Sequence, residues 1–83
     1  MTVELEMVAA LNTALERNDL GLILVALRDI ARARGMFQVA QQTGIARTRL
    51  YKDLSAKGNP KFSNVLKIIN VLGLRFHVAS KQD

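Results

Sequence analysis

Three side chains that can hydrogen-bond to nucleobases lie close together in the sequence: Arg47, Thr48 and Lys52. The planar guanidinium of Arg47 can bond guanine O6 and N7 together, and such a pair discriminates against a wrong base by about 1–3 kcal/mol. Thr48 suits a base edge or a thymine methyl group, and Lys52 suits a guanine or a phosphate. On one face of a helix, these three residues would form a base-reading edge for double-stranded DNA.

Donors that suit phosphate oxygens surround this edge. Phosphate contacts position a protein on DNA without specifying a sequence. The candidates are side chains and, near the glycine, backbone amides: Gln38, Arg49, Tyr51, Lys57, Gly58, Asn59 and Lys61. Arg49 and Lys61 are equally consistent with charged side chains that only contact solvent. Tyr51 is equally consistent with a packing residue.

The charges of the chain are divided unevenly along its length. Residues 32–61 carry seven basic residues and one acidic residue, a net charge of +6, within a chain whose total is +5. Residues 1–31 have a net charge of −3, and residues 62–83 one of +2. A basic block of this kind indicates a polyanionic partner, and the acidic end indicates a different one.

Helices at the right spacing would position these side chains. Apolar periodicity and the glycines predict helices over residues 3–17, 20–34, 36–43, 47–55 and 62–72. Asp19 suits the N-cap of the second helix, and Gly35 suits a left-handed cap at its end. The fifth helix carries one apolar stripe, made of Phe62, Val65, Leu66, Ile69 and Leu72. The whole chain is predicted to be one all-α domain.

Residues 36–55 have the pattern of a helix–turn–helix unit. Ala40 is small where the two helices approach, and Gly44 follows where the turn requires a positive φ. With Leu50 and Leu54 facing inward, Lys52 and Thr48 point outward and Arg47 lies on the flank. Two positions depart from the usual pattern. Ala46 is a poor N-cap, and Asp53 stands where an apolar residue is common, so Leu54 is expected to pack in its place.

After the fifth helix, apolar and polar residues alternate over positions 74–78, which predicts a short strand. A single strand has no partner within this chain and would be stable only beside a second copy or another protein. We therefore expect a homodimer interface that includes the fifth helix and the strand. Its predicted residues are Leu72, Leu74, Phe76 and Val78.

Catalytic, metal and membrane functions find little support. His77 is the one histidine, and no serine–histidine–aspartate set, metal cluster or phosphate loop is visible, so no enzyme activity, metal, cofactor or small-molecule substrate is expected. The chain has no cysteine. Its longest apolar run, residues 20–27, is far shorter than the ~20 residues that span a bilayer. A cytoplasmic location, with no membrane partner, is predicted.

Four segments together resemble a known family. They are "DIARARGM" (29–36), "QQTGIARTRLYKDLS" (41–55), "GNPKF" (58–62) and "VLKIINVLGL" (65–74). They are similar to the addiction-module antidote proteins, HigA-like antitoxins of the Xre/Cro helix–turn–helix group. Two positions depart from the family: Ala46 stands where the family usually has serine, and Lys61 where it usually has a small residue. The phosphate contacts of that loop are therefore expected to differ from those of the family.

The resemblance implies a bacterial type II antitoxin. Such proteins dimerise, repress their own operon by binding its operator, and neutralise a small basic RelE/HigB-like toxin. The acidic first two helices are then interpreted as the side that faces the toxin. Two other functions stay open: a solitary or phage-type Xre/Cro repressor without a toxin, and a helical interaction adaptor that does not bind DNA.

Overall fold

The computed structural model of the chain describes residues 2–81, with side chains from residue 5 onward. Over this range it is all-helical, with α1 Thr2–Glu16, α2 Leu20–Arg34, α3 Met36–Thr43, α4 Arg47–Asp53 and α5 Phe62–Val71. The predicted helical class is confirmed for these residues, and the predicted helix ends lie within two residues of the observed ones. No helix in the described range is both long and apolar enough to cross a membrane.

The residues between α1 and α2 and between α2 and α3 end and cap these helices as predicted, with one difference at Gly35. Asn18 adopts a positive φ of 55° between α1 and α2. Asp19 caps α2, because its Oδ1 accepts a hydrogen bond from the amide of Leu22 at 3.1 Å. Gly35 also has a positive φ, 105°, but its ψ of 109° lies outside the left-handed helical region that we predicted. The chain turns sharply there because α3 begins at the next residue.

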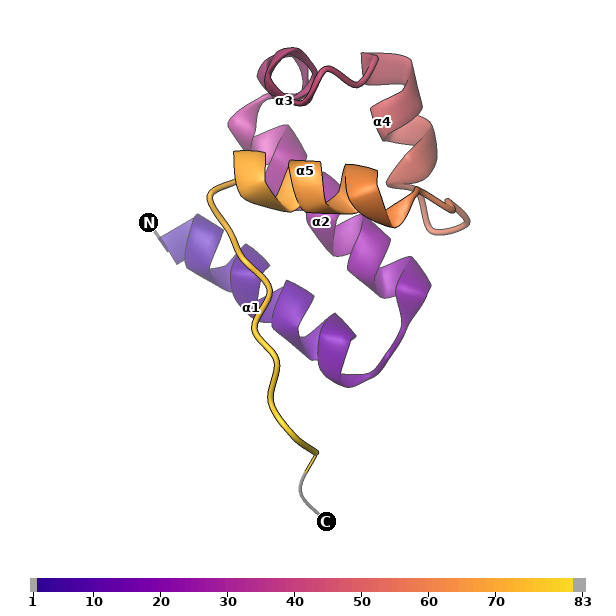
Figure 1. Ribbon diagram of the computed structural model, residues 1–83. Helices are drawn as coiled ribbons and strands as arrows, with labels where there is room; N and C mark the ends of the chain where they lie inside the picture. The colour runs from indigo at the N-terminus through magenta and orange to yellow at the C-terminus, as the bar shows by residue number, and fades with distance from the viewer. Residues whose placement is uncertain (1, 82–83) are drawn as a thin grey trace.

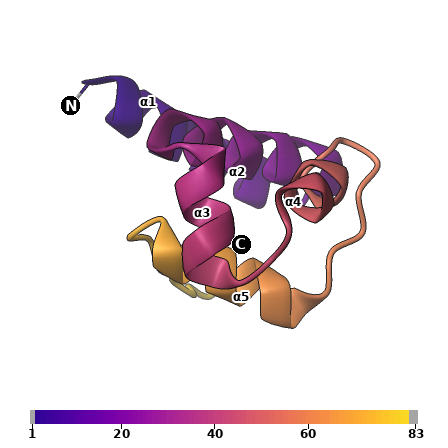
Figure 2. The ribbon, with the colours of Figure 1, turned by 90° about the horizontal axis from the view of Figure 1, so that it is seen from above.

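The helices form two groups that meet at α2 (Figure 1). α1 packs mainly against α2, and α3 contacts α2, α4 and α5. Seen from above, α3 lies between α2 and α5, and α4 lies beside them at the other end of α2 from the start of α1 (Figure 2). α1 is therefore at one end of the molecule, and the α3–α4 pair is at the other.

One hydrophobic core joins these elements. Its largest fully buried side chains are Leu24, Leu27, Ile30, Val39, Leu50, Leu54, Ile68 and Leu72. They come from every helix from α2 to α5 and from the residues that directly follow α4 and α5. Because α2 contributes three of them, it is the central element on which the other helices are placed.

The apolar face of α5 differs from the predicted stripe. Ile68, Ile69 and Leu72 are buried, whereas Phe62 is 67% exposed and Leu66 is 44% exposed. The apolar surface of α5 is wider than the area that the core covers, so one edge of the helix keeps apolar side chains in solvent.

The predicted C-terminal strand is absent from the described residues. Leu74 donates its amide to the carbonyl of Ile69 at 3.0 Å, and residues 75–81 make no backbone–backbone hydrogen bond within the described chain. This segment runs in front of α1 (Figure 1) and shares with it a hollow lined by Leu11, Leu15 and Phe76 among others. A strand requires a hydrogen-bonded neighbour, and residues 2–81 supply none.

Candidate nucleic-acid interface

A tight turn joins α3 to α4. Gly44 adopts the left-handed conformation, with φ 76° and ψ 10°, and donates its amide to the carbonyl of Ala40. The hydroxyl of Thr43 donates to the carbonyl of Val39 at 2.7 Å and accepts from the amide of Ile45 at 3.2 Å. These bonds hold the direction in which the chain enters α4, as the predicted helix–turn–helix unit requires.

Two leucines set the rotation of α4 about its own axis. Leu50 and Leu54 are fully buried, which confirms the predicted inward face. Every other residue of α4 except Asp53 is exposed, and this exposed set includes Arg47, Thr48 and Lys52. The three predicted base-reading residues therefore lie together on the solvent side of one short helix.

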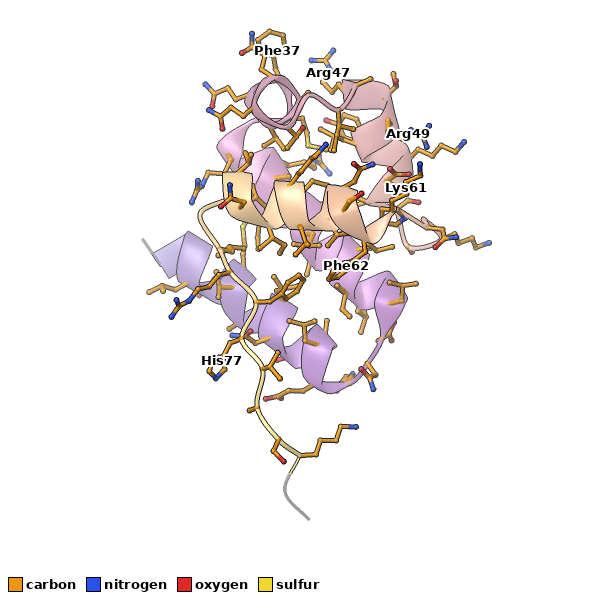
Figure 3. The ribbon with its side chains drawn as sticks, in the orientation of Figure 1. Phe37, Arg47, Arg49, Lys61, Phe62 and His77 are labelled. Carbon is orange, nitrogen blue, oxygen red and sulfur yellow. The ribbon has the colours of Figure 1, made fainter. Side chains whose placement is uncertain are left out.

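The start of α4 offers a partly open surface toward α3. Ala46 occupies the N-cap without a side-chain hydrogen bond, as its residue type predicts. Arg47, the first residue of the helix, shares a hollow of 610 Å³ with Phe37, Gln41 and the turn residues around Gly44. Figure 3 shows Phe37 and Arg47 at the same end of the molecule, both directed into solvent.

Sequence analysis did not identify Phe37 as part of this surface. Its side chain is 61% exposed, whereas the neighbouring Met36 and Val39 are buried. The helical period of α3 contains the signal, because inward-facing Met36, Val39 and Ala40 leave Phe37 outside the buried face. Gln38, a predicted phosphate contact, is exposed beside it.

The predicted phosphate-binding residues divide into two groups. Arg49, Asn59 and Lys61 line one hollow of 510 Å³ between α4 and the start of α5, together with Lys67. Arg49 and Lys61 lie on the same side of the molecule in Figure 3. Lys57, Gly58 and Tyr51 do not line this hollow. Lys57 is exposed in the loop after α4, and Tyr51 is 45% exposed on α4 itself.

Asp53, which the sequence pattern left unexplained, is the one acidic residue of the hollow. It is only 7% exposed. Its Oδ1 lies 4.0 Å from Nη1 of Arg49, one turn earlier in α4. Leu54 fills the core position next to it, as predicted. Asp53 thus places a negative charge within a group of three cations.

The backbone packs most closely at Gly58. A Cβ atom at this position would lie 2.1 Å from the carbonyl oxygen of Asp53 and 3.0 Å from that of Lys52. The glycine allows the loop to fold back against the C-terminal end of α4, and its amide donates to the carbonyl of Ser55 at 2.9 Å. Gly58 was predicted as a phosphate contact, and the structure gives it a packing role.

The residues predicted for a dimer interface have different surroundings. Leu72 is fully buried in the chain's own core, so its side chain offers no surface to a second copy. Leu74 is half-buried, Phe76 is 38% exposed and Val78 is 89% exposed. The ring of Phe76 stacks on that of Phe62, with centroids 6.2 Å apart.

Among the described residues, no group of histidine, cysteine, aspartate or glutamate side chains has the arrangement of a metal site. His77 is the one histidine of the sequence. It is exposed in the C-terminal segment beside α1 (Figure 3). The exposed face of α4 and the two hollows beside it form the candidate functional site.

Comparison with known proteins identifies the family of the chain. A family model described as "Probable addiction module antidote protein" matches residues 2–80. The chain belongs to this antidote family. A Haemophilus influenzae protein described only as uncharacterized is 49% identical over 78 residues, which cover 94% of this chain and 80% of that relative. No solved structure matches the chain.

Membership of the antidote family gives the chain a partner. An antidote acts by neutralising a toxin, so the family implies that this protein binds one. The match includes all five helices and the extended segment up to residue 80. The part of the chain that matches the antidote family therefore contains both the acidic first helices and the basic α3–α4 region.

Proposed function

We propose that this chain is the antitoxin of a type II toxin–antitoxin pair, a HigA-like member of the Xre/Cro group. It neutralises a RelE/HigB-like toxin in the bacterial cytoplasm and represses its own operon by binding operator DNA. The observation that carries the DNA-binding half is the outward face of α4, where Arg47, Thr48 and Lys52 are exposed on a helix that Leu50 and Leu54 hold in place. The N-terminal part of such a helix enters the major groove and contacts base edges.

The charge of the region supports a DNA partner. Residues 32–61 have a net charge of +6, and they contain all the basic side chains that are predicted to contact bases or phosphates. Each cation that meets a phosphate releases condensed counterions, so the affinity falls steeply as the salt concentration rises. Arg47 and Lys52 provide base recognition in this proposal, while Gln38, Arg49, Lys57 and Lys61 hold the phosphates.

A homodimer is part of the same proposal. Phe62, Leu66, Phe76 and Val78 form an exposed apolar surface that we call the C-terminal patch. Phe62 and Phe76 stack, Leu66 lies one turn from Phe62, and Val78 lies two residues from Phe76 in the extended segment. A second copy that pairs with residues 74–80 would cover this patch and give the segment its missing strand neighbour. Two α4 helices would then meet a palindromic operator at half-sites ~34 Å apart.

Substitutions on α4 test the recognition of bases. Arg47→Ala is expected to weaken operator binding about 10- to 100-fold and to reduce the preference for operator over random DNA, because one bidentate base contact is lost. Lys57→Ala is the matched control, and it should weaken both DNAs by the same smaller factor and lower the salt slope. Fluorescence anisotropy with both DNAs at several salt concentrations gives these values. Unchanged operator binding by the Arg47→Ala/Lys52→Ala double variant would show that α4 does not read DNA.

The buried carboxylate gives a second, opposite prediction. Asp53→Asn removes a negative charge beside Arg49, and it is expected to raise affinity for any DNA about two- to fivefold at low salt, since one nearby repulsion is worth about 0.5–1 kcal/mol in water. The gain should shrink as salt increases. Glu16→Gln on α1 changes charge equally and should have no effect. A loss of affinity in Asp53→Asn would instead show that Asp53 orients Arg49 for its contact.

A solitary Xre/Cro repressor would use the same DNA surface, so the reading frame beside that of this chain separates the two functions. In the proposed pair, this neighbouring frame encodes a small basic protein that binds the antitoxin and stops growth when it is expressed alone. A neighbouring product that neither binds this chain nor inhibits growth favours the solitary repressor.

A further inference from the structure

A shallow groove follows the outer side of the α1–α2 pair. Two adjoining hollows of 180 Å³ and 310 Å³ make it up, and both are lined by Ala10, Ala26 and Asp29. Glu6 and Met7 complete one hollow, and small or aliphatic side chains complete the other: Thr13, Ala14, Leu22 and Val25. We refer to these residues together as the α1–α2 groove.

The chemistry of the groove is apolar along its floor and acidic at its rim. Three alanines keep the floor low, so that a partner's side chains can approach both helices, and Leu22 is 44% exposed at one end. Glu6 and Asp29 are exposed, and no lysine, arginine or histidine lines either hollow. Asp29 lies 3.8 Å from Nη2 of Arg28, and a long, solvent-exposed pair of this kind leaves the acidic character of the rim largely in place.

The groove is separate from the two surfaces that the proposed function already uses. None of its lining residues belongs to α3, α4 or α5 or to the C-terminal patch. α1 lies at the end of the molecule opposite the α3–α4 pair (Figure 1). A protein bound in the groove would therefore leave the exposed face of α4 open to DNA.

We propose that the α1–α2 groove is the docking surface for the toxin. Its occupant is a toxin segment that places apolar side chains on the alanine floor and lysine or arginine side chains beside Glu6 and Asp29. Charge complementarity selects this occupant, because the groove lies in the part of the chain with a net charge of −3 and faces solvent with acids alone. The inference rests on the proposed antitoxin function and adds that toxin and operator bind at the same time.

Two pairs of variants test the groove against matched controls. Ala10→Trp fills both hollows from an exposed position, and Ala9→Trp places the same ring on the same helix at an exposed position outside the groove. The double charge reversal Glu6→Lys/Asp29→Lys alters the rim, and its control Glu16→Lys reverses a charge on α1 beside the C-terminal segment instead. Circular dichroism verifies that each variant keeps its helical content.

The binding probe is the purified protein encoded by the reading frame beside that of this chain. Isothermal titration should show that Ala10→Trp and the double charge reversal weaken its binding at least 10-fold, since residues at the centre of an interface contribute most to affinity. The two control variants should stay within about threefold, and all variants should bind operator DNA like the wild type. Adding the probe to the wild-type antitoxin–operator complex should give a slower band in a gel shift, which reports the ternary complex.

Other results separate the failure of the inference from that of the proposed function. If the wild-type chain does not bind the probe at all, the antitoxin function fails and the inference fails with it. If the wild type binds the probe and the groove variants bind it equally well, the function stands and the groove is the wrong surface. Loss of the dimer in Ala10→Trp would show a contact between copies instead, and release of DNA on adding the probe would overturn simultaneous binding.

Discussion

Gly58→Ala is expected to destabilise the fold more than any other single-methyl addition at a described glycine. The added Cβ would meet the Asp53 carbonyl oxygen at 2.1 Å and its carbonyl carbon at 2.7 Å. Both are backbone atoms, so no side chain can rotate away, and the loop must leave the end of α4. Gly58 does not have a positive φ, so the clash alone decides the effect. We expect a loss of about 3 kcal/mol or more in the free energy of unfolding, at the upper end of overpacking substitutions.

Gly44→Ala is the matched comparison. Gly44 has a φ of 76°, which L-residues rarely adopt, yet nothing lies within 4 Å of an added Cβ. Only backbone strain then opposes the substitution, and it is worth about 1–2 kcal/mol. Urea unfolding followed by circular dichroism gives both free energies. Equal losses in the two variants would mean that the loop at Gly58 relaxes easily and that the close packing there is unimportant for stability.

Leu54→Ala is expected to have the second large effect. Leu54 is fully buried and directly follows α4, so its truncation leaves a cavity beneath that helix. Truncations of this type lower the free energy of unfolding by about 2–5 kcal/mol. A domain of this size has total stability near the lower end of the usual ~5–15 kcal/mol, so a loss at the upper end of the range for such truncations would leave a large fraction of the molecules unfolded at 37 °C.

The same truncation at an exposed leucine provides the control. Leu5 is 67% exposed on α1, and Leu5→Ala should change stability by less than about 0.5 kcal/mol. Operator affinity adds a second measurement for Leu54→Ala. It should fall even at temperatures where the chain stays folded, because α4 loses the contact that sets its rotation. Full operator affinity in a destabilised but folded Leu54→Ala would show that Leu50 alone holds the helix.

Much of the local structure could be predicted because it depends on neighbouring residues. The 3.6-residue period placed Leu50 and Leu54 on the inner side of α4. The side-chain chemistry of Asp19 predicted the cap of α2. Gly44 predicted the turn, since few other residues adopt its φ. The exposure of Arg47, Thr48 and Lys52 follows from these features, and their roles in binding DNA stay predictions.

Other features could not be predicted because they depend on distances between separate elements. Periodicity assigned Phe62 and Leu66 to the apolar stripe of α5, but it cannot state how much of that stripe the core covers. Leu72 was assigned to a dimer surface and is buried instead, because the chain closes over it. The predicted strand is absent from the described residues, since strand formation requires a neighbour that the periodicity of one segment cannot supply.

The sequence by itself determined the positions of the helices, the tight turn between α3 and α4 and the separation of an acidic end from a basic middle. Each of these depends on residue type and on spacing within a few turns. Only the tertiary structure decided that Gly58 packs against the end of α4, that Asp53 lies in a basic hollow beside Arg49, and that α1 and α2 leave an acidic groove away from α4. These features arise where the loop path and helix packing bring atoms together, and no repeating pattern along the chain specifies those distances.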